Sequence, residues 1–535
     1  MIRISQLKLP AGHSKTELYH KAAKALHIKS EQIASLQIRR QSIDARKKPD
    51  IFLIYVVDIT LNGISEQNCV SRSKNKDVSI VTERPYQFPK PGTKALRRRP
   101  VIIGSGPAGL FCCYMLAQNG YRPILLERGK DVEARKKDVE AFWNGGPLNP
   151  ESNVSFGEGG AGTFSDGKLN TLIKDKDGRG RHVLSIFVEN GAQPEILYDA
   201  KPHIGTDVLS NVVKQMRKKI IQLDGEVRFE SRVETFRTEN GALTGVILSD
   251  GSVIETAVLA IGHSARDTFF KLYESGLHME AKAFAVGLRV EHPQELINQS
   301  QYGTLHPDSL GAAPYKVTAR TSGGRGVYSF CMCPGGYVVN ASSEPGRIAV
   351  NGMSYSGRNG ANANSAIIVS VTPADYGSDE PLAGIGFQRR LEEKAFSAGC
   401  GKIPVERYGD FSDTATTGHI PTEFVPAIKG QWTFADVKSV LPDSLSEAFI
   451  EGMEQFGHRI PGFDDANAVV SGIETRTSSP VRIVRDDTLQ ANIRGIYPCG
   501  EGAGYAGGIT SAAMDGVRVA EAIASCYAPF SEIGK

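Results

Sequence analysis

Residues 100–128 read PVIIGSGPAGLFCCYMLAQNGYRPILLER, and this stretch decides the fold of the chain. Its apolar start at 101–103 predicts a short buried strand, and the residues after the last glycine predict a helix. Between them, Gly104, Gly106 and Gly109 have the spacing G-x-G-x-x-G. Such glycines allow a tight turn, let a pyrophosphate approach the backbone and let the helix pack closely, with its first amides aimed at the phosphates. The stretch therefore predicts a dinucleotide-binding turn.

A second strand is expected at 124–126, and it ends in Glu127. This carboxylate follows Gly109 by 18 residues, close to the spacing of the acid that binds a ribose hydroxyl in such folds. Because a carboxylate repels a 2′-phosphate, NADP is disfavoured at this site. A glycine turn in an unrelated loop is the alternative, but the strand, the helix and the acid together favour a nucleotide site.

Length and composition indicate a globular protein of several domains. The 535 residues exceed one ordinary core, so two or three domains are expected. Hydrophobic residues make up 40% and charged residues 23%, and no apolar run approaches the roughly 18 residues that span a bilayer. The start Met1-Ile-Arg-Ile-Ser is typical of a strand and not of a secretory signal. We therefore expect no membrane span and a cytoplasmic location.

Eight cysteines are spread through the chain, at positions 69, 112, 113, 331, 333, 400, 499 and 526. They follow neither a metal-ligand spacing nor a disulfide framework, so we expect no metal site. Cys331-Met-Cys333 is either a redox or metal pair or two thiols buried along a strand. The second interpretation is favoured because no further pair stands at zinc spacing.

The first 85 residues predict a small basic α+β module. Residues 1–99 carry 20 Lys and Arg against 8 Asp and Glu, a net charge of +12, which leaves −9 for the rest of the chain. Residues 1–9 alternate as a strand does, and Ser14-Lys-Thr-Glu17 is a capping box that starts a helix. Further strands are expected at 35–40, 51–61 and 78–82. This order resembles the ferredoxin-like sandwich.

A basic cluster falls in an expected turn of this module and consists of Arg39, Arg40, Arg46, Lys47 and Lys48. It is interpreted first as a solvated loop, and otherwise as a surface for RNA or for an acidic electron-transfer partner. The module has no RNA-binding aromatic pattern and no G-x-x-G clamp, so the RNA interpretation lacks an element that contacts bases. Residues 86–99, rich in Pro, Lys and Arg, predict a linker.

A second glycine-rich segment, 151–172, exposes backbone amides to a ligand. Its glycines stand at 157, 159, 160, 162 and 167 among small hydroxyl residues. Phe156, Phe164 and Leu169 would anchor it, which argues against a flexible linker.

Two later segments predict helix starts. Residues 201–207 precede a helix that Thr206 or Asp207 would cap. The glycine-rich loop at 495–510 precedes a helix of small residues with Thr510 as the expected N-cap, a second place where an anion or a developing negative charge is stabilised.

The remaining signals are mostly those of strands. Residues 226–229 and 243–248 predict a hairpin, and 253–260 predicts an apolar strand followed by Ile261-Gly262-His263-Ser264. From about 270 to 470, a mostly β domain inserted into the nucleotide domain is expected. Its strands are expected at 284–290, 327–332, 337–339, 348–351 and 367–371. More polar side chains stand there than a plain sheet needs: Arg289, Glu291, His292, Asn351, Arg358, Asn362 and Asn364.

Together, the glycine turn, Glu127, the Ala260-Ile261-Gly262 turn and the Gly500-Glu501 loop resemble the glutathione-reductase-like FAD superfamily, with Ile for Thr and Glu for Asp as mild departures. Residues 157–168, with Ser42-Ile-Asp-Ala-Arg-Lys47, 201–207 and Asn351-Gly-Met353, resemble a narrower group of uncharacterised NAD(FAD)-utilising dehydrogenases over essentially the whole chain. The resemblance implies FAD as cofactor and names no substrate.

The implied fold is α/β, with a Rossmann-like FAD-binding domain, an inserted mostly β substrate domain and a small N-terminal α+β, ferredoxin-like domain. The implied division of the chain is 1–85 for the basic module, 86–99 for the linker, 100–270 and 471–535 for the FAD-binding domain, and 271–470 for the inserted domain. The implied cofactor-binding residues are Gly104, Ser105, Gly106, Pro107, Ala108, Gly109, Glu127, Arg128, Gly160, Ala161, Gly162, Thr163, Ser165, Lys168, Val233, Ala260, Gly262, Gly500, Glu501, Gly508, Ile509 and Thr510.

Flavin chemistry needs a substrate against N5 and usually a proton donor or acceptor. His203 and His263 are the candidates for that role, with an ordinary loop histidine as the alternative for each, and no catalytic residue is assigned. Gly323-Gly-Arg-Gly326 lacks the spacing of a second nucleotide turn, so the reductant is the substrate, a visiting nicotinamide or a protein carrier. The first hypothesis is an FAD-dependent oxidoreductase acting on a small molecule. The alternatives are a flavoprotein that acts on RNA, a redox-responsive binding protein and an NAD-only dehydrogenase.

Overall fold

The computed structural model describes residues 1–96, 98–249, 251, 253–254, 257–306, 310–413, 415 and 417–531. At its centre is a five-stranded parallel sheet in the order β24-β11-β5-β6-β7. The strands are β24 (Ile496–Pro498), β11 (Ala257–Leu259), β5 (Val101–Ile103), β6 (Ile124–Leu126) and β7 (Glu226–Arg228). The predicted strands at 101–103 and 124–126 are confirmed as neighbours in this sheet.

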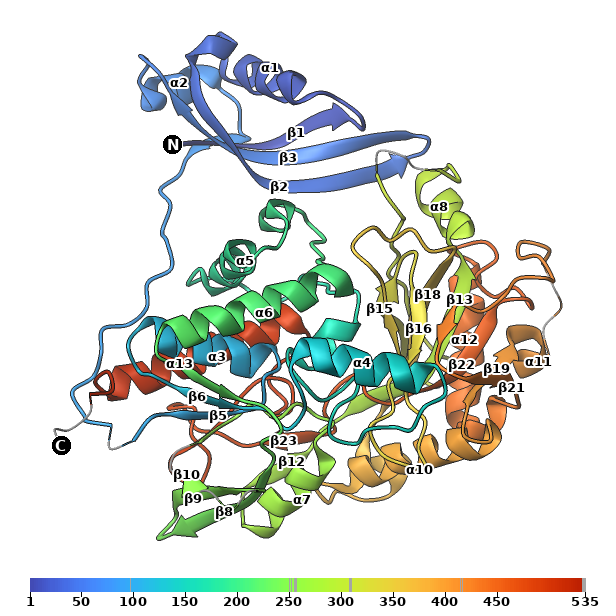
Figure 1. The fold of residues 1–535 in the computed structure, drawn as a ribbon. Helices are drawn as coiled ribbons and strands as arrows, with labels where there is room; N and C mark the ends of the chain where they lie inside the picture. Colours follow the sequence, from blue (N-terminus) through green and yellow to red (C-terminus); the bar gives the residue numbers. More distant parts are fainter. Residues whose placement is uncertain are drawn as a thin grey trace.

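Both faces of this sheet are covered, as its apolar strands require (Figure 1). Alternate residues such as Ile102 and Val258 face helices α3 (Pro107–Gln118), α13 (Ile509–Cys526) and α6 (Thr206–Gln222). The intervening residues face a small antiparallel sheet of β8 (Val233–Glu239), β9 (Ala242–Leu248) and β10 (Val253–Ile254). Helix α3 lies in the middle of the core, and almost all of its residues are buried.

Four of the local predictions for this region are wrong. The segment 226–229 does not form a hairpin with 243–248: β7 joins the parallel sheet, and the partner of β9 is β8. Both helix caps are displaced, because Gly205 and not Thr206 or Asp207 precedes α6, and Gly508 and not Thr510 precedes α13. The expected strand at 253–260 is divided into β10 and β11, and residues 255 and 256 lie outside the described part.

A second, seven-stranded sheet follows, in the order β14-β15-β18-β13-β22-β19-β21. Its centre is the long antiparallel pair β13 (Phe284–Pro293) and β18 (Asn362–Val371), flanked by β15 (Gly326–Cys333) and β22 (Val469–Glu474). The outer strands are β14 (Thr318–Arg320), β19 (Ile403–Arg407) and β21 (Trp432–Phe434). The predicted strands at 284–290, 327–332 and 367–371 are confirmed. The smaller strands β16 (Tyr337–Asn340) and β17 (Val350–Met353) pair beside this sheet with β20 (Ile428–Lys429).

This region is less purely β than predicted. Helices α10 (Ala383–Ala398) and α12 (Asp443–Gly457) pack on it and bury Phe387, Leu391, Phe449 and Phe456 in its core. Neither helix has a side-chain N-cap, because Leu382 and Pro442 precede them. The sequence therefore lacks the start signal that would have indicated them.

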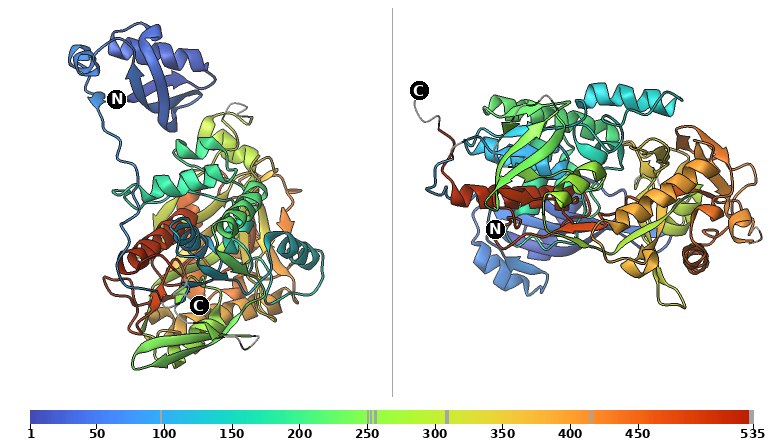
Figure 2. Two further views of the ribbon diagram at one scale, coloured as in Figure 1. Left: turned by 60° about the vertical axis from the view of Figure 1, so that its left-hand side comes forward. Right: turned by 90° about the horizontal axis from the view of Figure 1, so that it is seen from below.

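The N-terminal module is an antiparallel sheet in the order β2-β3-β1-β4, with two helices on one face (Figures 1 and 2). Its strands are β1 (Ile2–Pro10), β2 (Ile33–Lys47), β3 (Asp50–Leu61) and β4 (Val78–Ile80), and its helices are α1 (Lys15–Leu26) and α2 (Glu66–Ser73). The capping box of Ser14 and Glu17 is confirmed. Helix α2 was not predicted. The remaining segment, 86–96 and 98–99, runs along the central domain, where the Tyr86 hydroxyl donates to Glu521 at 2.8 Å.

The basic cluster does not form a loop, because four of its five residues lie on strand β2. Arg39 already binds Asp58 at 2.5 Å and Glu83 at 2.8 Å, and Arg46 binds Asp44 at 2.7 Å. These carboxylates neutralise part of the positive surface. Binding of RNA or of an acidic partner at this module stays a prediction.

Within the described ranges, no helix combines the length and the apolar character needed to cross a bilayer. The same residues contain no group of three or more His, Cys, Asp or Glu side chains placed to hold a metal ion.

Glu291 on β13 is a fully buried carboxyl group, and it makes stability depend on pH. One of its oxygens accepts from Asn362 at 3.0 Å and from the Ala427 amide at 2.8 Å, and the other has no partner in the described part. Burial raises the pKa of Glu291 to about 7 from an ordinary 4.5. Between these values the unfolded chain has lost the proton that the folded chain keeps, so stability falls as pH rises through this window.

We expect Glu291→Gln to remove this loss. From about pH 5 to about pH 8, the melting temperature of the wild-type protein should fall relative to that of the variant, and the difference in unfolding free energy should approach about 3 kcal/mol. The adjacent His292, whose pKa burial lowers to about 4, has the opposite pH dependence in both proteins and cancels in the comparison. Glu295→Gln, at an exposed position on α8 (Gln294–Tyr302), is the control. Parallel melting curves for wild type and Glu291→Gln at all pH values would contradict the assignment.

Candidate functional site

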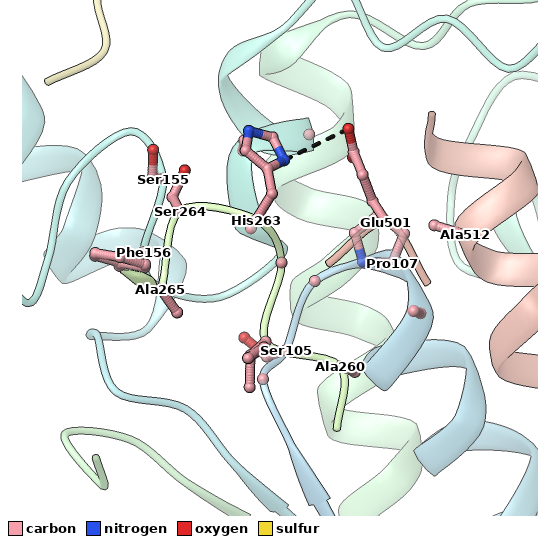
Figure 3. Close-up of a pocket in the computed structure, with 18 of the residues that line it drawn as sticks. Ser105, Pro107, Ser155, Phe156, Ala260, His263, Ser264, Ala265, Glu501 and Ala512 are labelled. Atoms are coloured by element: carbon pink, nitrogen blue, oxygen red, sulfur yellow. Dashed lines mark ion pairs between the residues drawn. The ribbon is translucent and has the colours of Figure 1, made fainter. Parts of the chain in front are cut away.

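One elongated pocket runs across the carboxyl ends of the parallel strands and encloses about 1400 Å³, including space open to solvent. This is the edge at which open α/β sheets bind their ligands. Its walls come from six separate stretches of the nucleotide region, from the seven-stranded sheet and from the neighbouring strand β17. Figure 3 shows several of these stretches meeting, with Ser105, Ser155, His263 and Glu501 around one space.

The three glycines of the first turn have three different roles. A Cβ on Gly104, which has φ +99°, would collide with the Ala260 carbonyl oxygen. A Cβ on Gly109 would collide with the Gly104 carbonyl oxygen and lie 3.2 Å from the Ala260 Cβ, so helix and strand pack here without a side chain between them. A Cβ on Gly106 would meet no atom within 4 Å and would enter the open pocket. The predicted division of roles among the glycines is confirmed for turn and packing.

Glu127 is buried at the end of β6 and accepts four hydrogen bonds. One of its oxygens accepts from the Ser105 amide at 2.9 Å and the Ser105 hydroxyl at 2.6 Å. The other accepts from the amides of Gly129 at 2.9 Å and Gly157 at 3.0 Å. This carboxylate therefore ties the first glycine turn to the second glycine-rich loop, in addition to lining the pocket. A sugar hydroxyl would have to share Glu127 with Ser105.

The second glycine-rich loop is held from behind by Arg135, which the sequence analysis missed. This arginine is fully buried on α4 (Val132–Trp143) and donates to the carbonyls of Asn153, Val154 and Glu158 at 2.7 to 2.8 Å. It also donates to the Thr163 hydroxyl at 2.7 Å. Burial lowers its pKa to about 10. Positions 132, 135 and 139 share one face of α4, so the sequence could have indicated that Arg135 is buried with Val132 and Val139. It could not indicate which groups Arg135 binds.

His263 and Glu501 face each other in the pocket (Figure 3). The distance from His263 Nδ1 to Glu501 Oε1 is 3.5 Å, and His263 Nε2 is buried with no partner in the described part. His203, the other catalytic candidate, is not among the pocket residues; its Nε2 lies 3.3 Å from the Ser356 carbonyl oxygen. The structure therefore brings one of the two candidate histidines to the pocket.

Most of the predicted cofactor-binding residues line this one pocket. They are Gly104, Ser105, Gly106, Pro107, Ala108, Glu127, Arg128, Gly160, Ala161, Gly162, Ser165, Val233, Ala260, Gly262, Glu501, Gly508 and Ile509. The others are adjacent to it: Gly109 packs against Gly104, Thr163 binds Arg135, the Gly500 amide donates to Asp515 at 2.8 Å, and the Thr510 hydroxyl donates to the Leu169 carbonyl at 2.6 Å. Lys168 pairs with His203 in an isolated bridge outside the pocket.

One wall of the pocket comes from the second sheet and the adjoining strand β17, and the sequence analysis singled out only Cys331 and Asn351 of it. This wall consists of Phe330, Cys331, Asn351, Glu474, Arg476 and Thr477. Arg289, fully buried on β13, holds it together by donating to Glu474 at 2.5 Å, Asn351 at 3.0 Å and the Cys331 carbonyl at 2.8 Å. Burial raises the pKa of Glu474, and Arg289 opposes this increase. The wall brings a thiol, a carboxyl and an amide to the pocket.

Family comparisons assign parts of the chain. Residues 283–477 match a family described as "FAD-dependent protein, C-terminal domain-like", and residues 102–146 match an "NAD(P)-binding Rossmann-like domain". Residues 1–60 match a domain of unknown function. A protein of Clostridium beijerinckii, described as an uncharacterized protein, is 47% identical over 528 residues, which is 98% of each chain.

Solved structures resemble the chain only distantly. The FAD complex of a glycerol-3-phosphate dehydrogenase from Bacillus halodurans aligns with 80% of this chain and 65% of its own, at 11% identity and a TM-score of 0.35. L-proline dehydrogenase from P. horikoshii aligns with 81% of this chain and 93% of its own, at 12% identity and a TM-score of 0.33. Likenesses this weak carry no argument about the reaction.

The Rossmann-like sheet and the family matches define an FAD-dependent oxidoreductase, with FAD as its cofactor. The chain belongs to the same family as the Clostridium beijerinckii protein.

The pocket fits FAD in three respects. Gly106 leaves open space where a pyrophosphate would approach the backbone. Helices α3 and α13 both start at the pocket without a side-chain cap, so their first amides are available to an anion. His263 Nε2 is a buried polar atom that a ligand would satisfy.

Proposed function

We propose that the protein transfers a hydride between N5 of FAD and a small-molecule substrate that lies against the wall formed by the second sheet. The observation that carries this proposal is the composition of the pocket. Segments at both ends of the nucleotide region line it, and residues of the second sheet line it as well. FAD supplies the hydride acceptor when it is bound, and the protein positions the substrate and moves its proton.

In this proposal, different residues of the nucleotide region bind different parts of FAD. Gly104, Gly106, Ala108 and Gly109 bind the pyrophosphate, Glu127 binds the adenosine ribose, and Val233 lies beside the adenine. The loop that contains Gly160, Gly162 and Ser165 runs along the pyrophosphate and the flavin, with Thr163 fixing it from behind. Glu501 and the start of α13 at Gly508 and Ile509 hold the ribityl chain and the N1–O2 edge, where a helix N-terminus stabilises negative charge. This arrangement would place the chain in the glutathione-reductase-like superfamily, with residues 271–470 as the inserted substrate domain.

Glu474 and Cys331 are the protic groups of the second sheet that face the pocket, and they are better placed to exchange a proton with a substrate than His203. His263 is paired with Glu501 near the expected phosphate and ribityl positions, so we assign it to cofactor binding. Phe330 on the same wall excludes water from this end of the pocket.

The electron donor is not provided by a second nucleotide turn at 323–326. Residues 323–325 form the turn between β14 and β15, and Gly326 begins β15. No helix start follows them, so this segment lacks the amides that bind a pyrophosphate.

The test is anaerobic photoreduction of the FAD-loaded protein, followed by reoxidation against a panel of metabolites and nicotinamides. We expect the flavin absorbance to bleach and to recover with at least one small-molecule acceptor. Phe330→Ala should slow this recovery more than tenfold while leaving FAD affinity unchanged, because the phenyl ring contributes to the substrate wall and not to the nucleotide region. Tyr328→Ala, on the same strand outside the pocket, is the matched control. A loaded flavin that no compound in the panel reoxidises would contradict the proposal.

A further inference from the structure

Strand β15 contains a bulge at the point where it reaches the pocket. Phe330 pairs with Ala366 on β18, and Cys333 pairs with Asn364. The chain therefore advances three residues on β15 while it advances two on β18, so β15 contains one extra residue. Cys331, inside the bulge, has φ +43°, a left-handed conformation that is rare for a side chain other than glycine. In a regular strand, consecutive side chains point to opposite faces, but here Phe330 and Cys331 both line the pocket. The bulge therefore brings Cys331, together with Phe330, into the pocket wall.

The second thiol of the motif contacts the backbone of the first cysteine. Cys333 is fully buried, and its Sγ lies 3.1 Å from the Cys331 carbonyl oxygen. Arg289 contacts both residues, with Nη1 2.8 Å from the Cys331 carbonyl oxygen and 4.0 Å from Cys333 Sγ. Both cysteines are free thiols.

The charges around the pair are mixed. Burial raises the pKa of the Cys331 thiol to about 12; Lys168 and Arg289 lower it, whereas Glu474 and Cys333 raise it. The balance keeps the reduced pair protonated, so electrons and protons have to move together when the thiols react.

We propose that Cys331 and Cys333 form a reversible dithiol–disulfide pair that exchanges two electrons with FAD. On oxidation, the two S–H bonds break, an S–S bond forms between the two sulfur atoms, two protons leave, and two electrons pass to FAD. The reverse step reduces the disulfide. This inference rests on the proposed placement of FAD, whose flavin end lies at the wall containing Cys331.

The position of the pair also defines the partner that can exchange with it. Cys333 is fully buried and Cys331 is partly buried in a pocket wall, so neither sulfur is presented to the surface of another protein. The external partner is therefore a low-molecular-weight thiol or disulfide. In its thiol form this partner would also be the electron donor that no second nucleotide turn provides.

The first experiment counts electrons in the FAD-loaded protein. Anaerobic dithionite titration should consume about four electrons per flavin in the wild-type protein and about two in Cys331→Ser and Cys333→Ser. Cys400→Ser, at an exposed cysteine, should keep the wild-type value. The flavin absorbance of each variant reports whether it is folded and loaded.

The second experiment needs no flavin turnover. After an acid quench and alkylation, mass spectrometry of the peptide containing residues 331 and 333 should find a disulfide in the air-oxidised protein and two alkylated thiols after treatment with dithiothreitol. Alkylation of both thiols in the oxidised protein, or a disulfide between Cys112 and Cys499 near the nucleotide turn, would overturn the inference. A loaded wild-type protein that takes up only about two electrons would also overturn it, while leaving the proposed function intact. A protein without flavin would instead contradict the proposed function.

Discussion

Gly106→Ala is expected to yield a folded protein that binds FAD more weakly, whereas Gly109→Ala is expected not to fold. The Cβ at position 106 enters the open pocket and meets no protein atom within 4 Å. The backbone there has φ −65°, which alanine adopts freely. The added methyl group would occupy the path of the pyrophosphate, so FAD affinity should fall by about fivefold to 150-fold, as expected for about 1–3 kcal/mol of overpacking.

The Cβ at position 109 has no such space. It would lie against the Gly104 carbonyl oxygen, which is rigid backbone, and the helix could move away only by opening the α3 core. Flavin fluorescence titration and the melting temperature of the flavin-free protein separate the two effects. If Gly106→Ala binds FAD as wild type does, the cofactor does not pass over this turn. If Gly109→Ala folds with an unchanged melting temperature, the packing account is wrong.

Arg266→Met should cost about 3–5 kcal/mol of stability, because it leaves a buried carboxylate short of a partner. Arg266 begins α7 (Arg266–Glu274) and is 1% exposed. Its guanidinium donates to both oxygens of Glu392 at 2.8 Å and to Glu344 at 2.6 Å. Glu392 lies on α10 and is fully buried; burial raises its pKa, but Arg476 and Arg266 outweigh this and hold the pKa well below its usual range.

This ion cluster joins the nucleotide region to the second sheet, so its loss should loosen the pocket as well as the fold. Urea unfolding of the flavin-free protein measures the stability change. Arg46→Met removes an exposed arginine that is paired with Asp44 on β2, and it should leave the unfolding curve unchanged. Equal curves for Arg266→Met and Arg46→Met would show that the buried cluster does not support the structure.

The sequence predicted the first glycine turn and its strands well because each feature there is local. Gly104, Gly106 and Gly109 act through backbone space a few residues apart, and the strands beside them are short apolar runs. The predicted helix caps at Thr206 and Thr510 failed for an instructive reason. The observed caps, Gly205 and Gly508, have no side chain that could accept hydrogen bonds from the first helix amides. In α13 these amides are therefore left available at the pocket.

Other features were beyond the sequence because they depend on partners far along the chain. Arg135 looks like an ordinary charge on α4 until the loop at 153–163 folds over it. The polar residues of β13 were noticed, but only the folded sheet reveals that Arg289 fixes Glu474, 185 residues away. The bulge that places Cys331 in the pocket wall is a change of register between β15 and β18. It depends on the pairing of the two strands and cannot be recognised in the sequence of either one.

The most direct test of the account is a crystal structure of the protein with FAD bound. We predict one FAD per chain, with its adenine beside Val233, its pyrophosphate over Gly106 and its flavin ring against the wall that contains Cys331 and Glu474. A flavin ring that lies away from this wall, or density for FAD outside this pocket, would contradict the account.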